Sequence, residues 1–440
     1  MKVNKSLFFA LAAGTALLSS CSSDDNELVP SVDNEGAVQE IVLQVANGGD
    51  GLVSRAGRPL YSSEAKQSIE NVVVFVCDKN NKILYKKAIT EWNKTGSTEY
   101  TQNGHGRQTT ITIPKAEKVS GTEFKIYAIG YHNTSDYDGL DAITSLVKEG
   151  TFTENTKLTL SKGIGEEIFA GSATVTIPAG TGFKANVILN RQVAGAFGYL
   201  EDIPYVQDAT TLKLVASSRN KGLVLGHFAN NQIPSNGGAN PVNFVINGTD
   251  AVTSADEKVI YTIDLTQWFA QVQDSDNDGL VDIDSWKNAL DNTNKDTVLL
   301  KKGAVLGANF VIPFAKSTTT ETNTFELQLC KATGEVVRTW VVKLPLKDQQ
   351  VDQPHSVWSW GTTWTETQSV KDTQNNYSIV RNHLYGIGKR DLDVPTKPGE
   401  PDPNPQPDPD KDKPESLNNK QELILQVNDN WELIHGMELD

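Results

Sequence analysis

The sequence predicts an all-β protein made of two antiparallel β-sandwich domains. Short runs rich in β-branched and aromatic residues recur along the chain, which is typical of strands. Helical periodicity is limited to Thr134–Val147, where we expect one short helix. With 440 residues, of which 38% are apolar, the chain is long enough for two buried cores plus extensions.

The strand-like segments form two series that meet near Asn190. The first series is expected at Asn71–Cys77, Lys82–Tyr85, Gln108–Ile113, Phe124–Tyr131, Ile168–Ile177 and Lys184–Asn190. The second is expected at Gly195–Leu200, Thr211–Ala216, Val259–Leu265, Phe310–Pro313, Thr324–Leu329, Val336–Val342 and Tyr377–Tyr385. We therefore predict one domain over residues 56–190 and a second over residues 191–394.

One strand sequence occurs twice, near opposite ends of the chain. Residues 39–45 read Gln-Glu-Ile-Val-Leu-Gln-Val and residues 421–427 read Gln-Glu-Leu-Ile-Leu-Gln-Val, so five of seven positions are identical. Either copy suits the same place in a sheet, and the tail of one molecule is then able to replace the first strand of another. Chance similarity between two amphipathic strands is the alternative.

The first copy follows a secretory leader. Residues 1–20 place Lys2 and Lys5 before an apolar run, which is the pattern of a signal peptide. Residues 18–21 read Leu-Ser-Ser-Cys and resemble a bacterial lipobox, so Cys21 is predicted to carry lipid and to become the new N-terminus. The acidic run that follows, Ser22–Glu27, resembles the tag of surface-exported lipoproteins in Bacteroidota. A plain signal peptide with an incidental cysteine is the alternative.

A proteolytic site is predicted between Arg55 and Ala56. The turn-rich residues 47–51 precede it, and small residues flank Arg55 in a segment that we expect to be exposed, where proteases cut. Cleavage there would release residues 21–55, which include the lipid and the first strand. An ordinary loop arginine is the alternative.

The second copy lies beyond a linker rich in proline. Residues 395–414 hold eight of the eighteen prolines, so they are expected to be extended, with a reach of roughly 60 Å. The linker is thus long enough to present the tail of residues 415–440 well away from its own body. Its apolar side chains need a groove in the same chain or in another. We predict that Leu423, Leu425, Val427 and Trp431 fill that groove.

Composition excludes several classes of function. The net charge of −15 and the pI near 4.9 argue against nucleic acid as a partner. Apart from Cys21, the cysteines are Cys77 and Cys330, which we expect to be buried thiols. The six histidines show no metal-ligand spacing, and the sequence has neither a phosphate-binding glycine loop nor a nucleophile motif. We therefore predict that the protein is not an enzyme and has no catalytic residues.

An acidic loop in the second domain resembles calcium-binding loops of the thrombospondin or dockerin type. Carboxylates alternate at positions 274, 276 and 278, and a glycine at 279 permits a sharp turn. The predicted calcium ligands are Asp274, Asp276, Asp278, Leu280 and Asp282. The ion would be structural, and no other cofactor is expected. An acidic surface turn without an ion is the alternative.

Several motifs, in this order, resemble the fimbrillin family of Bacteroidales, which forms major and minor fimbriae. They are Phe124–Ile129, Phe169–Ser172, Arg191–Ala194, Val380–Tyr385, the linker and the tail. The resemblance implies two transthyretin-like β-sandwich domains, maturation at Arg55 and a C-terminal donor strand. It also implies a stalk subunit, because tip-type subunits tend to lack such a tail.

The resemblance further implies partners and a location. The expected partners are other copies of the chain, anchor and tip subunits, an Arg-specific protease, the outer membrane through the lipid before cleavage, and unidentified ligands on host or bacterial surfaces. The expected location is a fimbrium on the cell surface, reached from an outer-membrane lipoprotein precursor.

A lipoprotein that binds glycans or host surfaces, and does not polymerise, is the alternative function. Trp358, Trp360 and Trp364 form an aromatic stretch that would stack sugars if it lay on an exposed face. Packing in a core or between domains is the competing interpretation of this stretch.

Overall fold

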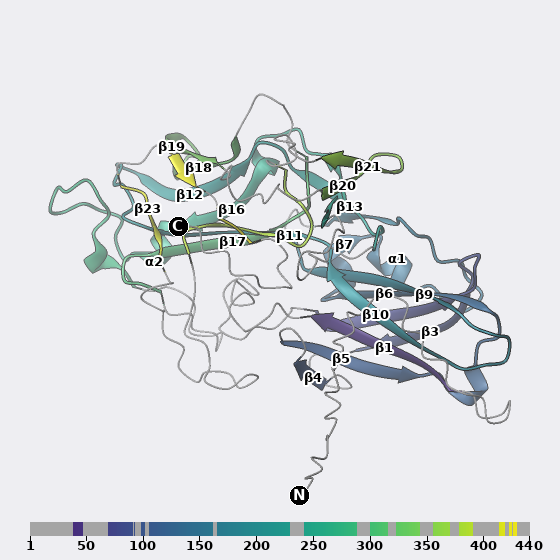
Figure 1. Cartoon of the computed structure of the whole chain (residues 1–440). Helices are drawn as coiled ribbons and strands as arrows, with labels where there is room; N and C mark the ends of the chain where they lie inside the picture. The colour runs from purple at the N-terminus through teal and green to yellow at the C-terminus, as the bar shows by residue number, and fades with distance from the viewer. Residues whose placement is uncertain are drawn as a thin grey trace, which may run out of the picture.

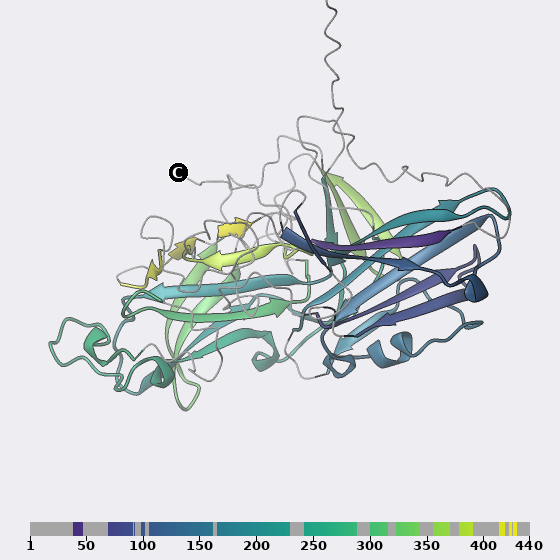
Figure 2. The same ribbon diagram turned by 90° about the horizontal axis from the view of Figure 1, so that it is seen from below.

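The computed structural model describes residues 38–46, 69–90, 92, 98–101, 105–161, 165–228, 242–287, 300–315, 323–343, 355–369, 378–389, 413–418, 422–424 and 426–428. These residues are nearly all β, as the sequence predicts, and they form two lobes (Figures 1 and 2). We call the eight-stranded sheet the N-terminal lobe and the two five-stranded sheets the C-terminal lobe. The predicted signal peptide and residues 395–412 of the predicted linker, together with Cys21, Arg55, Ala56, Leu425 and Trp431, lie outside the described residues.

The N-terminal lobe is one sheet of order β3-β2-β6-β9-β10-β1-β5-β4. Its strands are β1 (Gln39–Ala46), β2 (Asn71–Cys77), β3 (Ile83–Ile89), β4 (Thr98–Thr101), β5 (His105–Thr112), β6 (Glu123–Tyr131), β9 (Ile168–Thr176) and β10 (Phe183–Arg191). Strands β9 and β10 pair through only two residue pairs, Asn190 with Ala170 and Arg191 with Phe169. The sheet therefore divides there into two layers, and one buried cluster joins Ile41 of β1 to Val72 of β2.

Strand β2 confirms the strand that the continuous apolar run at Asn71–Cys77 predicts. Val72 and Val74 face the cluster shared with β1, whereas Val73 and Phe75 face the second large buried cluster. Because side chains alternate along a strand, a strand covered on both faces is apolar at every position.

The C-terminal lobe contains two sheets, of order β17-β11-β22-β25 with β23 beside β11, and of order β16-β12-β18-β19-β24. The first has β11 (Ala194–Glu201), β17 (Val305–Val311), β22 (Leu384–Ile387), β23 (Glu415–Ser416) and β25 (Gln426–Asn428). The second has β12 (Ala209–Ala216), β16 (Val259–Asp264), β18 (Asn323–Lys331), β19 (Val336–Lys343) and β24 (Glu422–Ile424). Tyr199 of β11 and Trp340 of β19 are both fully buried in one cluster between these sheets.

Two small sheets connect the lobes, with orders β15-β13-β8-β7 and β14-β20-β21. Their strands are β7 (Tyr137–Asp138), β8 (Lys157–Leu160), β13 (Asn220–Val224), β14 (Val242–Ile246), β15 (Gly248–Ala251), β20 (His355–Trp360) and β21 (Trp364–Ser369). The pairing of β8 with β13 joins residues from both sides of the predicted boundary at Asn190. That boundary falls inside β10, and β11 of a different sheet begins four residues later, at Ala194.

Helices are few and short among the described residues. They are α1 (Leu140–Thr144), α2 (Leu265–Trp268) and the 3-10 turns η1 (Lys115–Glu117), η2 (Thr134–Asp136), η3 (Asp256–Lys258) and η4 (Ile283–Ser285). The predicted helix over Thr134–Val147 is thus shorter than expected, because Gly139, with φ of 93°, separates η2 and β7 from α1. In the described part of the chain, no helix has the length and apolar character needed to cross a membrane.

The structure also gives the state of the two cysteines and the directions in which the strands pair. Cys77 and Cys330 are buried and unbridged, as expected, and burial raises the pKa of the Cys77 thiol to about 12. Most described strand pairs are antiparallel, but β1 with β10, β11 with β22 and β23, β14 with β20, and β19 with β24 are parallel.

Candidate functional site

The first copy of the doubled sequence forms β1, an interior strand of the N-terminal lobe. It runs parallel to β10, from Gln39 opposite Phe183 to Val45 opposite Leu189, and antiparallel to β5. In Figure 1, β1 is the purple strand between the β10 and β5 labels. Among the described strands, β5 and β4 reach the rest of the lobe only through β1. We call the space between β10 and β5 the slot.

The side chains of β1 complete the core of the lobe. Ile41 and Leu43 are fully buried, and both belong to the cluster that includes Ile111 of β5 and Val187 of β10. Burying a large aliphatic side chain stabilises a fold by roughly 1.5–3 kcal/mol. An empty slot would therefore expose both a long strand edge and an apolar trough.

The start of the slot holds a polar contact. The side-chain amide of Gln39 donates from Nε2 to the carbonyl oxygen of Val119 at 2.8 Å, and Val119 N–H donates to Oε1 at 3.0 Å. The backbone carbonyl of Gln39 also accepts from Ile113 N–H at 2.9 Å. Nearby, a Cβ at Gly182 would lie 2.0 Å from the carbonyl oxygen of Val38, so only glycine fits there.

Sequence reasoning included Gln39 in the repeat without a role, and it missed Val119 and Gly182. The repetition of glutamine at position 421 was the signal for Gln39. Nothing in the sequence marks Val119, because its backbone, and not its side chain, makes the contact.

The second copy lies on its own chain in this structure. Strand β24 adds parallel to β19, with Leu423 opposite Val342, and is the yellow strand beside the β19 label in Figure 1. Strand β25 adds antiparallel to β22, with Val427 opposite Tyr385. Just before it, Leu417 is fully buried in the core of the C-terminal lobe. The described part of the tail therefore lies on its own body here, which is the same-chain case of the groove that the sequence predicts. The physical reason is that β19 and β22 would otherwise end their sheets with unpaired backbone.

The predicted cleavage site lies in the connection between β1 and the rest of the chain. Strand β1 ends at Ala46, and the next described residue is Ile69, so Arg55 falls between them in sequence. A cut there breaks the covalent link between β1 and all the strands that surround it.

Two of the quoted motifs meet between the lobes. Arg381 Nη1 donates to Gln192 Oε1 at 3.1 Å and to the carbonyl oxygen of Gly226 at 3.2 Å. The backbone N–H of Asn382 donates to the carbonyl oxygen of Val193 at 3.0 Å. Arg381 and Gln192 are both buried, so the motifs serve packing between segments far apart in sequence.

The tryptophan stretch packs in the same region. Trp358 stacks on His227 with ring centroids 4.1 Å apart, and Trp364 Nε1 donates to Asn155 Oδ1 at 2.6 Å. Trp360 lies edge-on to Trp364 at 5.3 Å. All three tryptophans are partly buried, and their contacts favour packing between segments over an open sugar platform.

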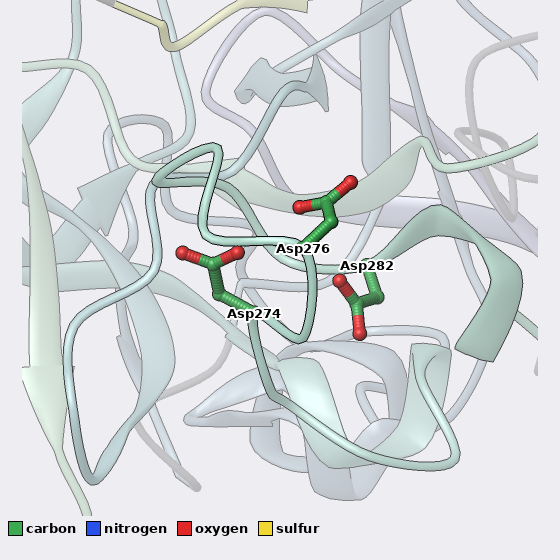
Figure 3. Close-up of side chains that lie close together, drawn as sticks. All are labelled: Asp274, Asp276 and Asp282. Atoms are coloured by element: carbon green, nitrogen blue, oxygen red, sulfur yellow. The ribbon is translucent and has the colours of Figure 1, made fainter.

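The acidic loop brings together three of its five predicted ligands. Oxygens of Asp274, Asp276 and Asp282 lie within 4.8 Å of one another (Figure 3). Asp278 is not in this group, and its N–H instead donates to Asp274 Oδ1 at 3.1 Å. The backbone of Leu280 forms a bridge with Pro204.

Hydrogen bonds and like charges in this loop shift two pKa values. The backbone hydrogen bond from Asp278 lowers the pKa of Asp276, but desolvation and the neighbouring carboxylates outweigh it, so the net direction is upward. Hydrogen bonds from Ser275 lower the pKa of Asp282. A cation would relieve the repulsion among these carboxylates.

The described residues define an all-β protein of two lobes, with an interior slot that the N-terminal segment fills. No protein-family model and no curated protein matches the chain. Solved structures that resemble the chain include the fimbrial anchor protein Mfa2 from Porphyromonas gingivalis (9% identity, 78% of this chain and 99% of that chain, TM-score 0.33). Two others are the tip fimbrial protein Mfa3 from the same species, with C-terminal truncation (10%, 81% and 96%, 0.33), and a putative adhesin from Bacteroides ovatus (12%, 82% and 92%, 0.37). These structural neighbours are Mfa-type fimbrial proteins and putative adhesins from Bacteroidales, at low identity.

Proposed function

We propose that this chain is a structural subunit of a surface fimbria that polymerises by exchange of a donor strand. The observation that supports this proposal is that β1 fills an interior slot and has a near copy in the tail. An interior strand is an unusual element to place on a removable segment. Its placement is reasonable when a replacement strand exists.

The proposed precursor is an outer-membrane lipoprotein anchored through Cys21. With β1 in the slot, the precursor presents no open edge there and is protected from aggregation. Cleavage after Arg55 by an Arg-specific protease releases residues 21–55. The tail of a second copy then leaves β19 and β22 of its own chain and enters the slot.

The alignment of the two copies assigns the entering side chains. Leu423 takes the place of Ile41, Leu425 that of Leu43 and Val427 that of Val45, while Trp431 extends the contact beyond the copied strand. Four large apolar side chains contribute an upper figure of roughly 6–12 kcal/mol. Ordering costs reduce this figure, and backbone pairing adds to it. The balance is enough for a durable noncovalent joint.

The proposal includes the other members of a fimbria. Anchor and tip subunits would occupy the ends of the filament, and adhesion to host or bacterial surfaces would be its purpose.

The glycan-binding alternative has less support, because its tryptophans contact His227 and Asn155. We also propose that calcium, when present, makes the acidic loop rigid and has no catalytic role.

The proposal is tested with precursor lacking the signal and Cys21. Treatment with an Arg-specific protease, N-terminal mapping and electron microscopy should show one cut after Arg55, followed by filaments. The matched control is Arg55→Ala, which should stay uncut and monomeric. Cleaved wild-type protein that stays monomeric would favour a tip subunit or a binding lipoprotein.

A further inference from the structure

Gln39 is a polar residue on the buried face of β1. Its side chain bonds to Val119, which lies in the loop between η1 and β6. Gln39 shares the two-residue alternation of Ile41 and Leu43, and only 4% of it is exposed. Its side-chain amide makes both a donor and an acceptor contact with the peptide groups of Val119, which is itself 8% exposed. We call this pair of hydrogen bonds the Gln39 clamp.

The clamp specifies register in a way that the aliphatic residues do not. A strand that slips by one residue turns its apolar face outward, so one-residue errors are strongly disfavoured. A slip by two residues keeps the face and merely exchanges Ile41, Leu43 and Val45 for one another. The same slip either places the Gln39 amide among apolar side chains or leaves the buried backbone of Val119 without its partner, and each error is costly.

The tail repeats this residue at the matching position. Gln421 aligns with Gln39, two residues before Leu423, as Gln39 stands two residues before Ile41. We propose that Gln421 sets the register of the tail strand in the slot of a second copy, by bonding to the backbone of Val119 there. This inference rests on the proposed function and adds to it a specificity-determining residue on the donor and its counterpart on the acceptor.

The chain offers a matched control on the same strand. Gln426 aligns with Gln44, which follows the alternation of Val42 and so belongs to the opposite face of β1. Substitution of Gln421 and of Gln426 by methionine removes the same amide and keeps a similar volume. Only the first substitution removes the clamp.

Register is measured by disulfide trapping in cleaved, full-length chains. Val42 lies opposite Thr110 of the antiparallel neighbour β5, with Gln108 and Thr112 two residues to either side. Thr110 and Thr112 are exposed, and opposed residues of antiparallel strands lie close enough for a disulfide. Molecules with Ile424→Cys are therefore mixed with molecules that carry Thr110→Cys, Gln108→Cys or Thr112→Cys, and each intermolecular product is quantified.

We expect wild-type tails to trap at position 110. The Gln421→Met variant should raise the ratio of slipped products, at 108 or 112, to the in-register product by roughly tenfold, while Gln426→Met should leave it unchanged. In uncut protein with Val42→Cys, the Gln39→Met variant should raise the same ratio for β1, which tests the clamp without assembly.

The outcomes separate this inference from the proposed function. Filaments with the wild-type register in Gln421→Met would overturn the register role and leave the proposed function standing. If cleaved Ile424→Cys chains that keep Gln421 give no intermolecular disulfide with position 108, 110 or 112, both the register role and the proposed function would be overturned.

Discussion

Arg191 and Glu167 form a buried ion pair at the end of β10, where the chain passes from one lobe to the other. Arg191 Nη2 lies 2.5 Å from Glu167 Oε1, and Nε donates to the same oxygen at 2.7 Å. The two side chains are 5% and 0% exposed. Arg191 also lies over the ring of Phe169, with 4.8 Å between its guanidinium carbon and the ring centroid. The pair thus fixes the strand that borders the slot.

The first prediction concerns this pair. Glu167→Ala should lower the free energy of unfolding by about 3–5 kcal/mol, because it leaves a buried guanidinium without its carboxylate. Urea denaturation of uncut protein measures the change. The matched control is Glu335→Ala, which breaks the more exposed pair with Lys331 at 3.0 Å and should cost less than about 1 kcal/mol. Equal losses in the two variants would contradict the prediction.

The second prediction is that Leu43 matters before cleavage and not after it. Leu43→Ala should destabilise the uncut precursor by about 2–5 kcal/mol, because Leu43 is fully buried in the slot. Filaments grown from the cleaved variant should resist denaturant as wild-type filaments do, since β1 has left. Denaturation of both species tests this, and a variant filament that is weaker than wild type would show that β1 stays.

The third prediction concerns the tail. Leu425→Asp should stop polymerisation, because it places a charge in the apolar slot, and should leave the monomer folded. Size-exclusion chromatography, circular dichroism and electron microscopy of cleaved protein provide the readout. Glu422→Ala is the control, since Glu422 aligns with Glu40 on the other face and should allow filaments. Normal filaments from Leu425→Asp would exclude the donor assignment.

Sequence patterns predicted the strands whose apolar runs are continuous. Residues 71–77 were read with the bounds that β2 has, because both of its faces are buried. The predicted strand over Tyr377–Tyr385 was wrong at residues 378–383, which are described and lie outside any strand. Asn382 takes a left-handed conformation with φ of 62°, and its neighbours bond to other segments, so the described strand β22 begins only at Leu384.

The missed elements depend on distant partners. Strand β8 is four residues long and pairs with β13 sixty residues later, which no local pattern signals. The pairing of β1 with β10 and β5 likewise depends on the whole fold, although its sequence repeat was visible. The sequence left open whether the tail lies on its own chain or on another, and nothing in it identifies β19 and β22 as the strands that pair with Leu423 and Val427.

The fourth prediction concerns calcium. Calorimetric titration of wild-type protein should show binding to the acidic loop and an upward thermal shift, and Asp274→Asn should abolish both. Because desolvation and then the neighbouring carboxylates raise the pKa of Asp276, its ionisation opposes folding as pH rises through its ordinary range. Asp276→Asn should therefore leave calcium-free protein at least as stable at pH 7. No heat and no thermal shift with calcium would refute the site.

The fifth prediction follows from His227, which stacks on Trp358 between the lobes. Burial first, and then the charge of Arg381, lower its pKa from the ordinary 6.5 to about 4. The unfolded chain therefore binds a proton below pH 6.5 that the folded protein does not, so His227 makes stability fall as pH falls from 6.5 to 4. His227→Phe keeps the stack and cannot titrate, so the midpoint of thermal unfolding should depend less on pH across that range. The control is His132→Phe, since His132 is 44% exposed beside Asp136 and should leave that dependence closer to wild type. A His227→Phe profile as steep as wild type would show that other groups cause the acid sensitivity.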